Sequence, residues 1–223
     1  MITFENIRYR LLAIDSLTIA PGITSVIGRN GAGKSTFLKL CTGVAEPESG
    51  TVLVDGRSPR ETEIGYVNEF PDRNILFSTV KDELASPLRF RHTPCRETVR
   101  AVSTCAETWG ISRILDREMR GLSGGEKILV ALATACITRP RVLVCDEYDS
   151  HLDSGRCTDV EKALRASGAE YIIRCTQQME TAAEGDNLLF FEKGQVIHEG
   201  TPATVFSGLN NTPFYPLSWR CRV

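Results

Sequence analysis

A glycine-rich stretch near the N-terminus constrains the fold more than any other feature of the chain. Residues 28–35 read GRNGAGKS, directly after the apolar run 23–27 and before a helix-forming run at 34–42. They fit the pattern GxxxxGK[ST] in the strand-loop-helix context that this pattern requires. The glycines let the backbone curl so that amide N–H groups and a helix N-terminus point at one anion. The stretch therefore predicts a nucleotide phosphate site in an α/β protein.

The roles of the loop residues follow from their chemistry. The Lys34 ammonium is expected to neutralise the β and γ phosphates, the Ser35 hydroxyl to reach Mg²⁺, and Thr36 to add a phosphate contact. ATP and Mg²⁺ are therefore the expected ligands, although the loop alone does not separate kinases, GTPases, transport ATPases and DNA-repair ATPases. The predicted ATP-binding residues of the loop are Asn30, Gly31, Ala32, Gly33, Lys34, Ser35 and Thr36.

Strand and helix signals alternate along most of the chain, which predicts a mostly parallel sheet covered by helices on both faces. Between about 70 and 138 the apolar residues recur at helical spacing, which predicts an inserted helical subdomain. We expect one domain over 1–208 and an irregular tail at 209–223. Strands are predicted at 2–9, 14–20, 23–27, 51–54, 64–67, 142–145 and 171–175, helices at 34–42, 125–138, 154–166 and 179–184, and a hairpin at 188–199.

Composition excludes several classes of protein. With 24% charged residues, 42% hydrophobic residues and a net charge of -2, the chain of 223 residues has no basic excess for nucleic acid. The eight cysteines form no CxxC pair, and the N-terminus does not resemble a secretory signal, so free thiols in a reducing cytoplasm are expected. The longest apolar run, 128–137, is about half of the roughly 20 residues that a bilayer-crossing helix needs. Membrane association is therefore expected to come through a partner.

A second motif places two carboxylates beside the predicted phosphate site. The apolar run 142–145 ends in Asp146 and Glu147, as expected of a buried parallel strand whose C-terminal end opens on a site. In a phosphoryl-transfer site Asp146 is expected to hold the Mg²⁺ shell, and Glu147 to orient and polarise the attacking water. A core strand that enters an acidic surface loop is the alternative, and the preceding phosphate loop makes it the weaker one.

The segment LSGGE at 122–126 precedes that strand by about twenty residues. With GRNGAGKST and RVLVCDE, it makes nearly the whole chain resemble the ABC ATPases. The resemblance implies a P-loop NTPase with a RecA-like, mostly parallel sheet, an N-terminal antiparallel β subdomain and an inserted helical subdomain. It also implies that two cassettes pair head to tail, so that LSGGE of one chain caps the γ phosphate held by Lys34 of the other. The implied trans contacts are Ser123, Gly124, Gly125 and Glu126. In isolation the segment is better explained as a serine-capped helix start, and its order and spacing with the other two motifs favour the family signature instead.

Two further positions take roles from the same resemblance. Tyr9 resembles the aromatic residue that stacks on adenine, although a tyrosine in a β-hairpin is often a packing residue. The stretch SHLD at 150–153 resembles the D-loop, with His151 in place of the usual small residue. Asp153 is then expected at the dimer interface, and a helix N-cap is the competing interpretation.

The chain departs from the family pattern at two positions that bear on hydrolysis. Gln177 stands where the family has the switch histidine, and an amide donates a hydrogen bond but carries no positive charge. Glu69 stands where the family has a glutamine that touches Mg²⁺ and the water, with Asn68 as the substitute if the register slips by one. A carboxylate there is a competent magnesium ligand but adds negative charge near the phosphates. We expect slower hydrolysis than in a fully equipped cassette.

The resemblance extends to a class of transporter. The segment 67–84, VNEFPDRNILFSTVKDEL, is similar to the corresponding stretch of energy-coupling-factor and cobalt-type importers. It implies a cytoplasmic ATPase on the inner face of the membrane, bound to transmembrane subunits and to a second cassette that is either a copy or a paralogue. The alternatives are a soluble cassette of cluster assembly or DNA repair, and a regulatory cassette with little turnover.

Overall fold

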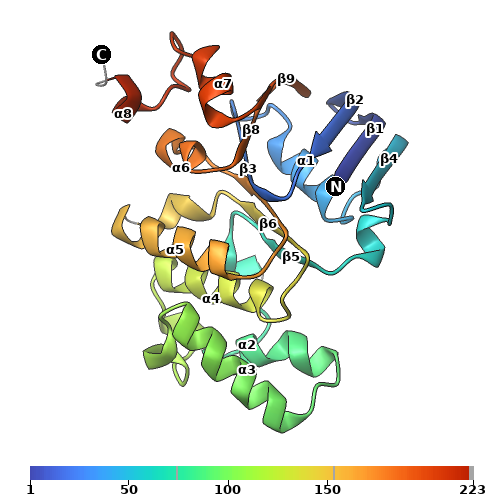
Figure 1. Ribbon diagram of the computed structural model, residues 1–223. Helices are drawn as coiled ribbons and strands as arrows, with labels where there is room; N and C mark the ends of the chain where they lie inside the picture. Colours follow the sequence, from blue (N-terminus) through green and yellow to red (C-terminus); the bar gives the residue numbers. More distant parts are fainter. Residues whose placement is uncertain (74, 153, 221–223) are drawn as a thin grey trace.

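The computed structural model describes residues 1–73, 75–152 and 154–220 (Figure 1). Its central sheet has six strands in the order β5-β6-β7-β3-β8-β9. Every neighbouring pair is parallel except β8 and β9, which form an antiparallel hairpin at the sheet edge. The strands are β3 (Gly22–Gly28), β5 (Ile64–Val67), β6 (Val142–Asp146), β7 (Tyr171–Cys175), β8 (Asn187–Glu192) and β9 (Gln195–Gly200).

The strand register brings the phosphate loop and the two carboxylates to one edge of this sheet. Val26 of β3 pairs with Cys175 of β7, and Cys175 pairs in turn with Asp146 of β6. Because these strands are parallel, their carboxyl ends meet on the same side. The predicted α/β fold with a mostly parallel sheet is therefore confirmed.

A smaller antiparallel sheet, in the order β2-β1-β4, packs beside the central one (Figure 1). Apolar residues alternate along its strands and face α1, where Phe37 lies 4.9 Å from Phe4 and 5.0 Å from Phe191 between ring centroids. This helix, which begins at the phosphate loop, thus lies in a core shared by both sheets. The elements are β1 (Ile2–Tyr9), β2 (Leu12–Ile19), β4 (Ser49–Val54) and α1 (Lys34–Cys41).

A helical region forms the end of the molecule farthest from the small sheet (Figure 1). Helix α2 packs against both α3 and α4, and the buried side chains of these helices share one hydrophobic cluster with β6. The α-helices here and along the rest of the core are α2 (Val80–Phe90), α3 (Cys95–Thr108), α4 (Gly124–Cys136), α5 (Ser154–Ala166) and α6 (Met179–Ala183). The short 3₁₀ segments are η1 (Pro59–Glu61), η2 (Pro71–Arg73), η3 (Ser112–Ile114), η4 (Met119–Gly121) and η5 (Tyr148–His151).

The C-terminal segment is more ordered than the composition of 209–223 led us to expect. After α7 (Pro202–Ser207) the chain turns and forms α8 (Leu217–Arg220). Trp219 packs edge-on against Phe206 at 5.4 Å, so this segment covers a third hydrophobic cluster beside β8. The division into a domain of 1–208 and a separate tail stays a prediction.

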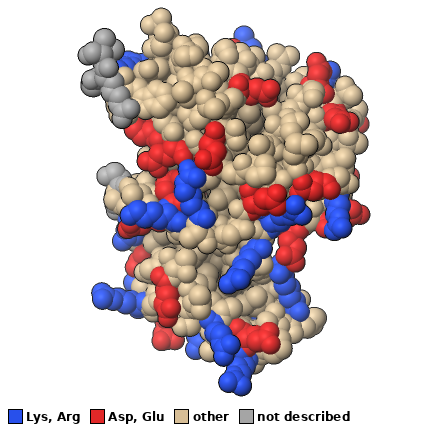
Figure 2. Space-filling view, in the orientation of Figure 1, with Lys and Arg blue, Asp and Glu red and all other residues tan. Residues whose placement is uncertain are grey.

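The helices of the structure are short, and the charges on its surface are mixed. Across the described ranges, every helix falls short of the length and apolar character that crossing a membrane demands. Basic and acidic side chains are interspersed over the face drawn in Figure 2, so neither sign of charge dominates it.

Candidate functional site

The phosphate loop has a backbone that only glycines accommodate. Gly28, Gly31 and Gly33 have φ values of 146°, 79° and 103°. A Cβ on Gly28 would lie 2.3 Å from the carbonyl oxygen of Phe191, and one on Gly33 would lie 2.8 Å from Leu12 Cδ2. All three glycines thus have a positive φ, and Gly28 and Gly33 are in addition tightly packed against their neighbours.

Lys34 begins α1 and folds back across this loop. Its Nζ donates hydrogen bonds to the carbonyl oxygens of Gly28, at 2.9 Å, and Arg29, at 3.3 Å, and the residue is only 5% exposed. A buried ammonium held by carbonyls beside the N-terminus of a helix forms a site for an anionic group. The residues present here fit a nucleotide phosphate.

Asp146 ends β6 and faces the same loop. It is 4% exposed, and burial is the main cause that raises its pKa. The charges of Glu147 and Glu69 raise the pKa further, while hydrogen bonds with Ser35 and Cys175 lower it in part. Among the described residues no group donates to its Oδ1. A buried carboxylate oxygen without a partner is costly, and a cation with its water shell would satisfy it. Ser35, Asp146 and Glu69 therefore fit a magnesium site.

Glu147 and Gln177 are brought together by neighbouring strands. Glu147 has a left-handed backbone, with φ 48°, and its N–H donates to the carbonyl of Cys175 at 3.0 Å. Gln177 Nε2 donates to Glu147 Oε2 at 2.7 Å and to Asn30 Oδ1 at 3.4 Å. The residue in the place of the switch histidine thus links the carboxylate to the phosphate loop.

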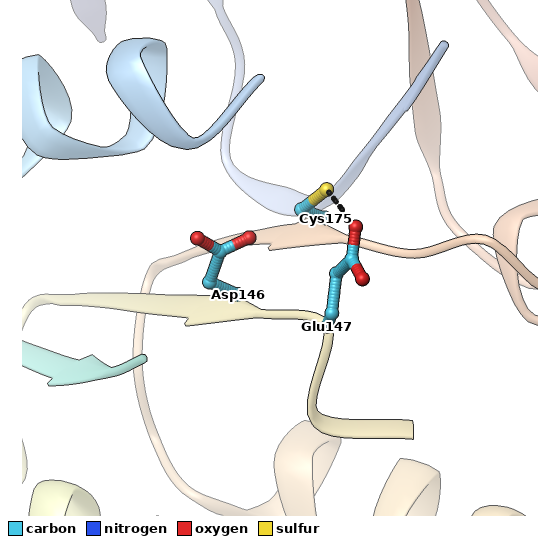
Figure 3. Close-up of side chains that lie close together, drawn as sticks. All are labelled: Asp146, Glu147 and Cys175. Atoms are coloured by element: carbon cyan, nitrogen blue, oxygen red, sulfur yellow. Dashed lines mark hydrogen bonds between the residues drawn. The ribbon is translucent and has the colours of Figure 1, made fainter. Parts of the chain in front are cut away.

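Cys175, which was not among the predicted site residues, lies beside the two carboxylates. Its sulfur lies 3.9 Å from Glu147 Oε1, and one ligand atom each from Asp146, Glu147 and Cys175 lie within 4.8 Å of one another (Figure 3). Burial raises the pKa of its thiol well above the usual range. The thiol is free, as the sequence predicts, and its position beside the two carboxylates comes from the register of β6 and β7.

Tyr9 lies at the end of β1, where a hairpin leads into β2. Gly194 ties this hairpin to the phosphate loop, since its carbonyl accepts from Ala13 N–H and its own N–H donates to the carbonyl of Ala32, both at 2.9 Å. Tyr9 is half-buried, and the Arg10 guanidinium lies 5.3 Å from its ring centroid. The hairpin is thus beside the loop, and adenine stacking on Tyr9 stays a prediction.

The LSGGE segment forms a separate and self-contained structure at the N-terminus of α4. Ser123 and Glu126 make a capping box, in which Ser123 N–H donates to Glu126 Oε2 at 2.8 Å and Ser123 Oγ accepts from Glu126 N–H at 3.3 Å. These bonds from Ser123, together with Arg117, lower the pKa of Glu126. The first turn of α4 thus already holds a carboxylate of its own chain, which sequence reasoning did not foresee although S-x-x-E is a capping-box pattern.

A second set of contacts joins the segment after Glu147 to the segment after β7. The Asp149 carboxylate accepts a short hydrogen bond from Thr176 Oγ1, and Gln178 Nε2 donates to the Asp149 carbonyl at 3.0 Å. Thr176 and Gln178 flank Gln177 in the chain, and these contacts with Asp149 were not predicted. Asp153 of the predicted D-loop lies outside the described residues, and so does the side chain of His151.

The comparisons with known proteins agree with this geometry. The family model described as ABC transporter matches residues 12–150, which include the phosphate loop, LSGGE and both carboxylates. The energy-coupling factor transporter ATP-binding protein EcfA1 of Lacticaseibacillus paracasei is 32% identical over 216 residues, which cover 92% of this chain and 78% of that protein.

Two solved structures are similar in fold. One is cbiO1 from Clostridium perfringens, described as part of the ABC transporter complex cbiONQ, with a TM-score of 0.83, 27% identity and coverage of 92% of this chain and 90% of that one. The other is a dimeric ATP-binding cassette in a post-hydrolysis state with ADP and phosphate, with a TM-score of 0.82, 21% identity and coverage of 91% and 99%. The matched family and the convergence of Lys34, Asp146 and Glu147 on one sheet edge identify this chain as an ATPase cassette of the ABC transporter family.

Proposed function

We propose that this chain binds and hydrolyses ATP to energise a membrane importer of the energy-coupling-factor or cobalt type. Relatives that carry those names match almost its full length. The observation that carries the proposal is the cluster of side chains at the carboxyl ends of β3, β6 and β7. There Gln177 bonds both Glu147, at 2.7 Å, and Asn30 of the phosphate loop, at 3.4 Å.

The chemistry of the pocket follows from its own residues. Lys34 and the loop amides bind the phosphates of the substrate ATP, and Glu147 accepts a hydrogen bond from the attacking water, which orients and polarises it. Ser35, Asp146 and Glu69 would hold Mg²⁺, which neutralises phosphate charge when bound.

Gln177 and Glu69 make this pocket slower than a fully equipped one. The Gln177 amide donates a hydrogen bond but does not carry the positive charge that an imidazolium would place near the γ phosphate. Glu69 adds a negative charge that already raises the pKa of Asp146. Weakening one contact to the transition state in this way corresponds to a rate loss of about 10 to 100 fold.

The pocket is completed by a second cassette. Ser123, Gly124 and Gly125 lie at the exposed start of α4 and would cap the ATP of the partner, with Asp153 as the predicted D-loop residue at the interface. In a heterodimer this LSGGE would serve a partner pocket that keeps the usual histidine and glutamine. Pairing with such a paralogue is therefore a natural arrangement for this chain.

The transmembrane subunits would dock beside Glu69. Phe70 and Leu76 are 45% and 69% exposed in the segment that follows Glu69, and Figure 1 places this segment between the sheet and the helical region. Apolar side chains exposed next to a site are typical of contacts with a partner protein. The chain would then lie in the cytoplasm, on the inner face of the membrane, through these partners.

The proposal is tested by purifying the tagged full-length chain from detergent-solubilised membranes of its native host. Integral membrane subunits and a second cassette should co-purify, and their complex should hydrolyse ATP. Recovery of soluble cluster-assembly or repair partners alone would overturn the transport assignment and leave the ATPase intact.

A further inference from the structure

A buried acid, Asp149, joins two segments of the candidate site, and the proposed hydrolysis does not use it. Asp149 lies in η5, directly after Glu147, and is 1% exposed. Its carboxylate accepts a short hydrogen bond from the hydroxyl of Thr176, a residue that is also 1% exposed. Burial raises the pKa of Asp149, and the bond from Thr176 opposes that shift. Because a buried carboxylate is costly unless it is hydrogen-bonded, this contact stabilises the arrangement of both segments.

Both chain neighbours of Gln177 are fixed to Asp149. Thr176 donates to the carboxylate, and Gln178 Nε2 donates to the Asp149 carbonyl at 3.0 Å. The Gln178 N–H also donates to Thr176 Oγ1 at 2.9 Å, so the Thr176 hydroxyl joins the carboxylate to the backbone on the far side of Gln177. The backbone of Gln177 is therefore held on both sides.

The turn that carries Glu147 is the other end of this linkage. Ser150 donates to the Glu147 carbonyl from its N–H at 3.3 Å and from its Oγ at 2.8 Å. Asp149 belongs to the same turn and so connects the backbone of Glu147 to that of Gln177. The bond of 2.7 Å from Gln177 Nε2 to Glu147 Oε2 lies between the two connected segments.

We propose that Asp149 and Thr176 form a clamp of two positioning residues, which holds the Gln177 amide against Glu147 in the geometry that hydrolysis requires. The inference rests on the proposed function, because it concerns the same pocket. The clamp acts only through Gln177 and the turn of Glu147. A displacement of about 1 Å in a catalytic contact can cost a rate loss of about 100 fold. Since Gln178 still bonds the Asp149 carbonyl when the Thr176 hydroxyl is removed, we expect a smaller loss.

The test compares Thr176→Val, which keeps the side-chain shape without the hydroxyl, with Thr176→Ser, which keeps the hydroxyl. In the assembled complex Thr176→Val should lower the kcat of ATP hydrolysis about tenfold and leave the KM for ATP within about twofold, because the phosphate loop is unchanged. Thr176→Ser should restore most of the lost kcat. The matched control is Thr24→Val, which should hydrolyse ATP like the wild type. Thr24 is also 1% exposed, and among the described residues its hydroxyl has no hydrogen-bond partner.

The Gln177→Ala background separates a positioning role from a merely structural one. In that background Thr176→Val should change kcat less than about twofold, because the amide that it positions is gone. A tenfold loss of kcat in both backgrounds would overturn the positioning role. So would a loss in Thr24→Val as large as that in Thr176→Val, or a failure of Thr176→Ser to restore turnover.

Amide hydrogen exchange of the nucleotide-free, full-length chain tests the clamp without any turnover. Exchange of the Glu147 and Ser150 amides should be faster in Thr176→Val than in the wild type and unchanged in Thr24→Val, because the turn opens more easily without the clamp. Unchanged exchange in Thr176→Val would overturn the clamp and leave the ATPase of the proposed function intact. Faster exchange in Thr176→Val, with no ATP hydrolysis by the wild-type complex, would contradict the proposed function and leave the clamp without a catalytic role.

Discussion

The pocket at the sheet edge and the LSGGE segment differ in how they are held. In the pocket, groups from β3, β6 and β7 bond to one another, as in the contacts of Gln177 with Glu147 and Asn30. The LSGGE segment bonds mainly to itself, through the capping box of Ser123 and Glu126. One region is assembled by long-range contacts within the chain, and the other is a local structure that presents an exposed helix start.

This difference indicates which parts of the proposed ATPase site a single chain supplies by itself. The residues proposed to bind the phosphates, to hold the metal and to orient water lie together in one chain, whereas the proposed cap on the γ phosphate would come from a partner. Glu126 adds a detail to the comparison, because its carboxylate sits on the helix N-terminus that would face the partner's phosphate. A bound phosphate would have to share that helix start with it.

The largest effect is expected from Glu147→Gln, which keeps the shape of the side chain and removes the charge that polarises water. ATP hydrolysis in the assembled complex should fall by about 10² to 10⁴ fold, in line with general-base catalysis. ATP binding should change little, since the phosphate loop is untouched. Turnover within threefold of the wild type would remove Glu147 from the reaction.

A large effect on stability is expected at Arg174, a residue of β7. Arg174 is fully buried and bonds Ser25 Oγ at 3.0 Å and Tyr148 at 3.1 Å, and it makes a short ion pair with Glu161. Arg174→Met leaves the Glu161 charge buried and uncompensated, which should lower the free energy of unfolding by about 3 to 5 kcal/mol. Urea denaturation of the wild type and the variant measures this difference in the free energy of unfolding.

The matched control for that variant is the double substitution Arg174→Met with Glu161→Leu. Removing both charges should recover a large part of the lost stability, because an apolar pair replaces an ion pair at modest cost. A double variant as unstable as Arg174→Met alone would show that the loss comes from packing and not from the stranded carboxylate.

A moderate effect is expected from Gln177→His, which restores the usual residue of the family in the pocket. Hydrolysis by the assembled complex should rise by about 10 to 100 fold if a weakened contact to the transition state limits the rate. Gln177→Ala, which cannot bond either Glu147 or Asn30, should instead fall below the wild type. Equal turnover of the wild type and Gln177→His would contradict the assignment of a slow pocket.

The smallest effect is expected at the LSGGE segment, where the structure is local. Ser123→Ala removes the helix cap and should cost about 1 kcal/mol of stability. The pKa of Glu126 is lowered by its bonds to Ser123, so its stabilising contribution is complete above the unfolded-state pKa and is lost as the pH falls through the folded-state pKa.

Glu126→Gln should therefore show a shallower loss of stability in acid than the wild type, measured by denaturation at a series of pH values. Identical pH profiles would show that the capping box contributes no charge-dependent stability in solution.

The fold was predictable from local patterns, because hydrophobic runs and glycines lie where the strands and the loop need them. The predicted strands 2–9 and 171–175 agree with Ile2–Tyr9 and Tyr171–Cys175. Strand β2 begins at Leu12 and not at 14, because pairing with β1 continues to the hairpin turn. Turn geometry, not apolar alternation, sets that boundary.

Within the site, residues of the known motifs were predictable, and residues joined by strand register were not. Cys175 and Asp146 are far apart in sequence and meet only because β6 and β7 are adjacent and parallel. The bond between Thr176 and Asp149 has the same origin. The S-x-x-E pattern predicts the capping role of Glu126, whereas the resemblance to the family signature predicts a contact with the partner chain.

The central claim is that the phosphate loop and LSGGE act in different sites, and ATP binding to the isolated monomer tests it most directly. The measurement is the affinity for a fluorescent ATP analogue with Mg²⁺, compared among the wild type, Lys34→Ala and Ser123→Arg. We predict that Lys34→Ala loses binding by more than about 100 fold, since a buried charge-assisted contact is removed, and that Ser123→Arg binds like the wild type. Equal loss of binding in both variants would contradict the account.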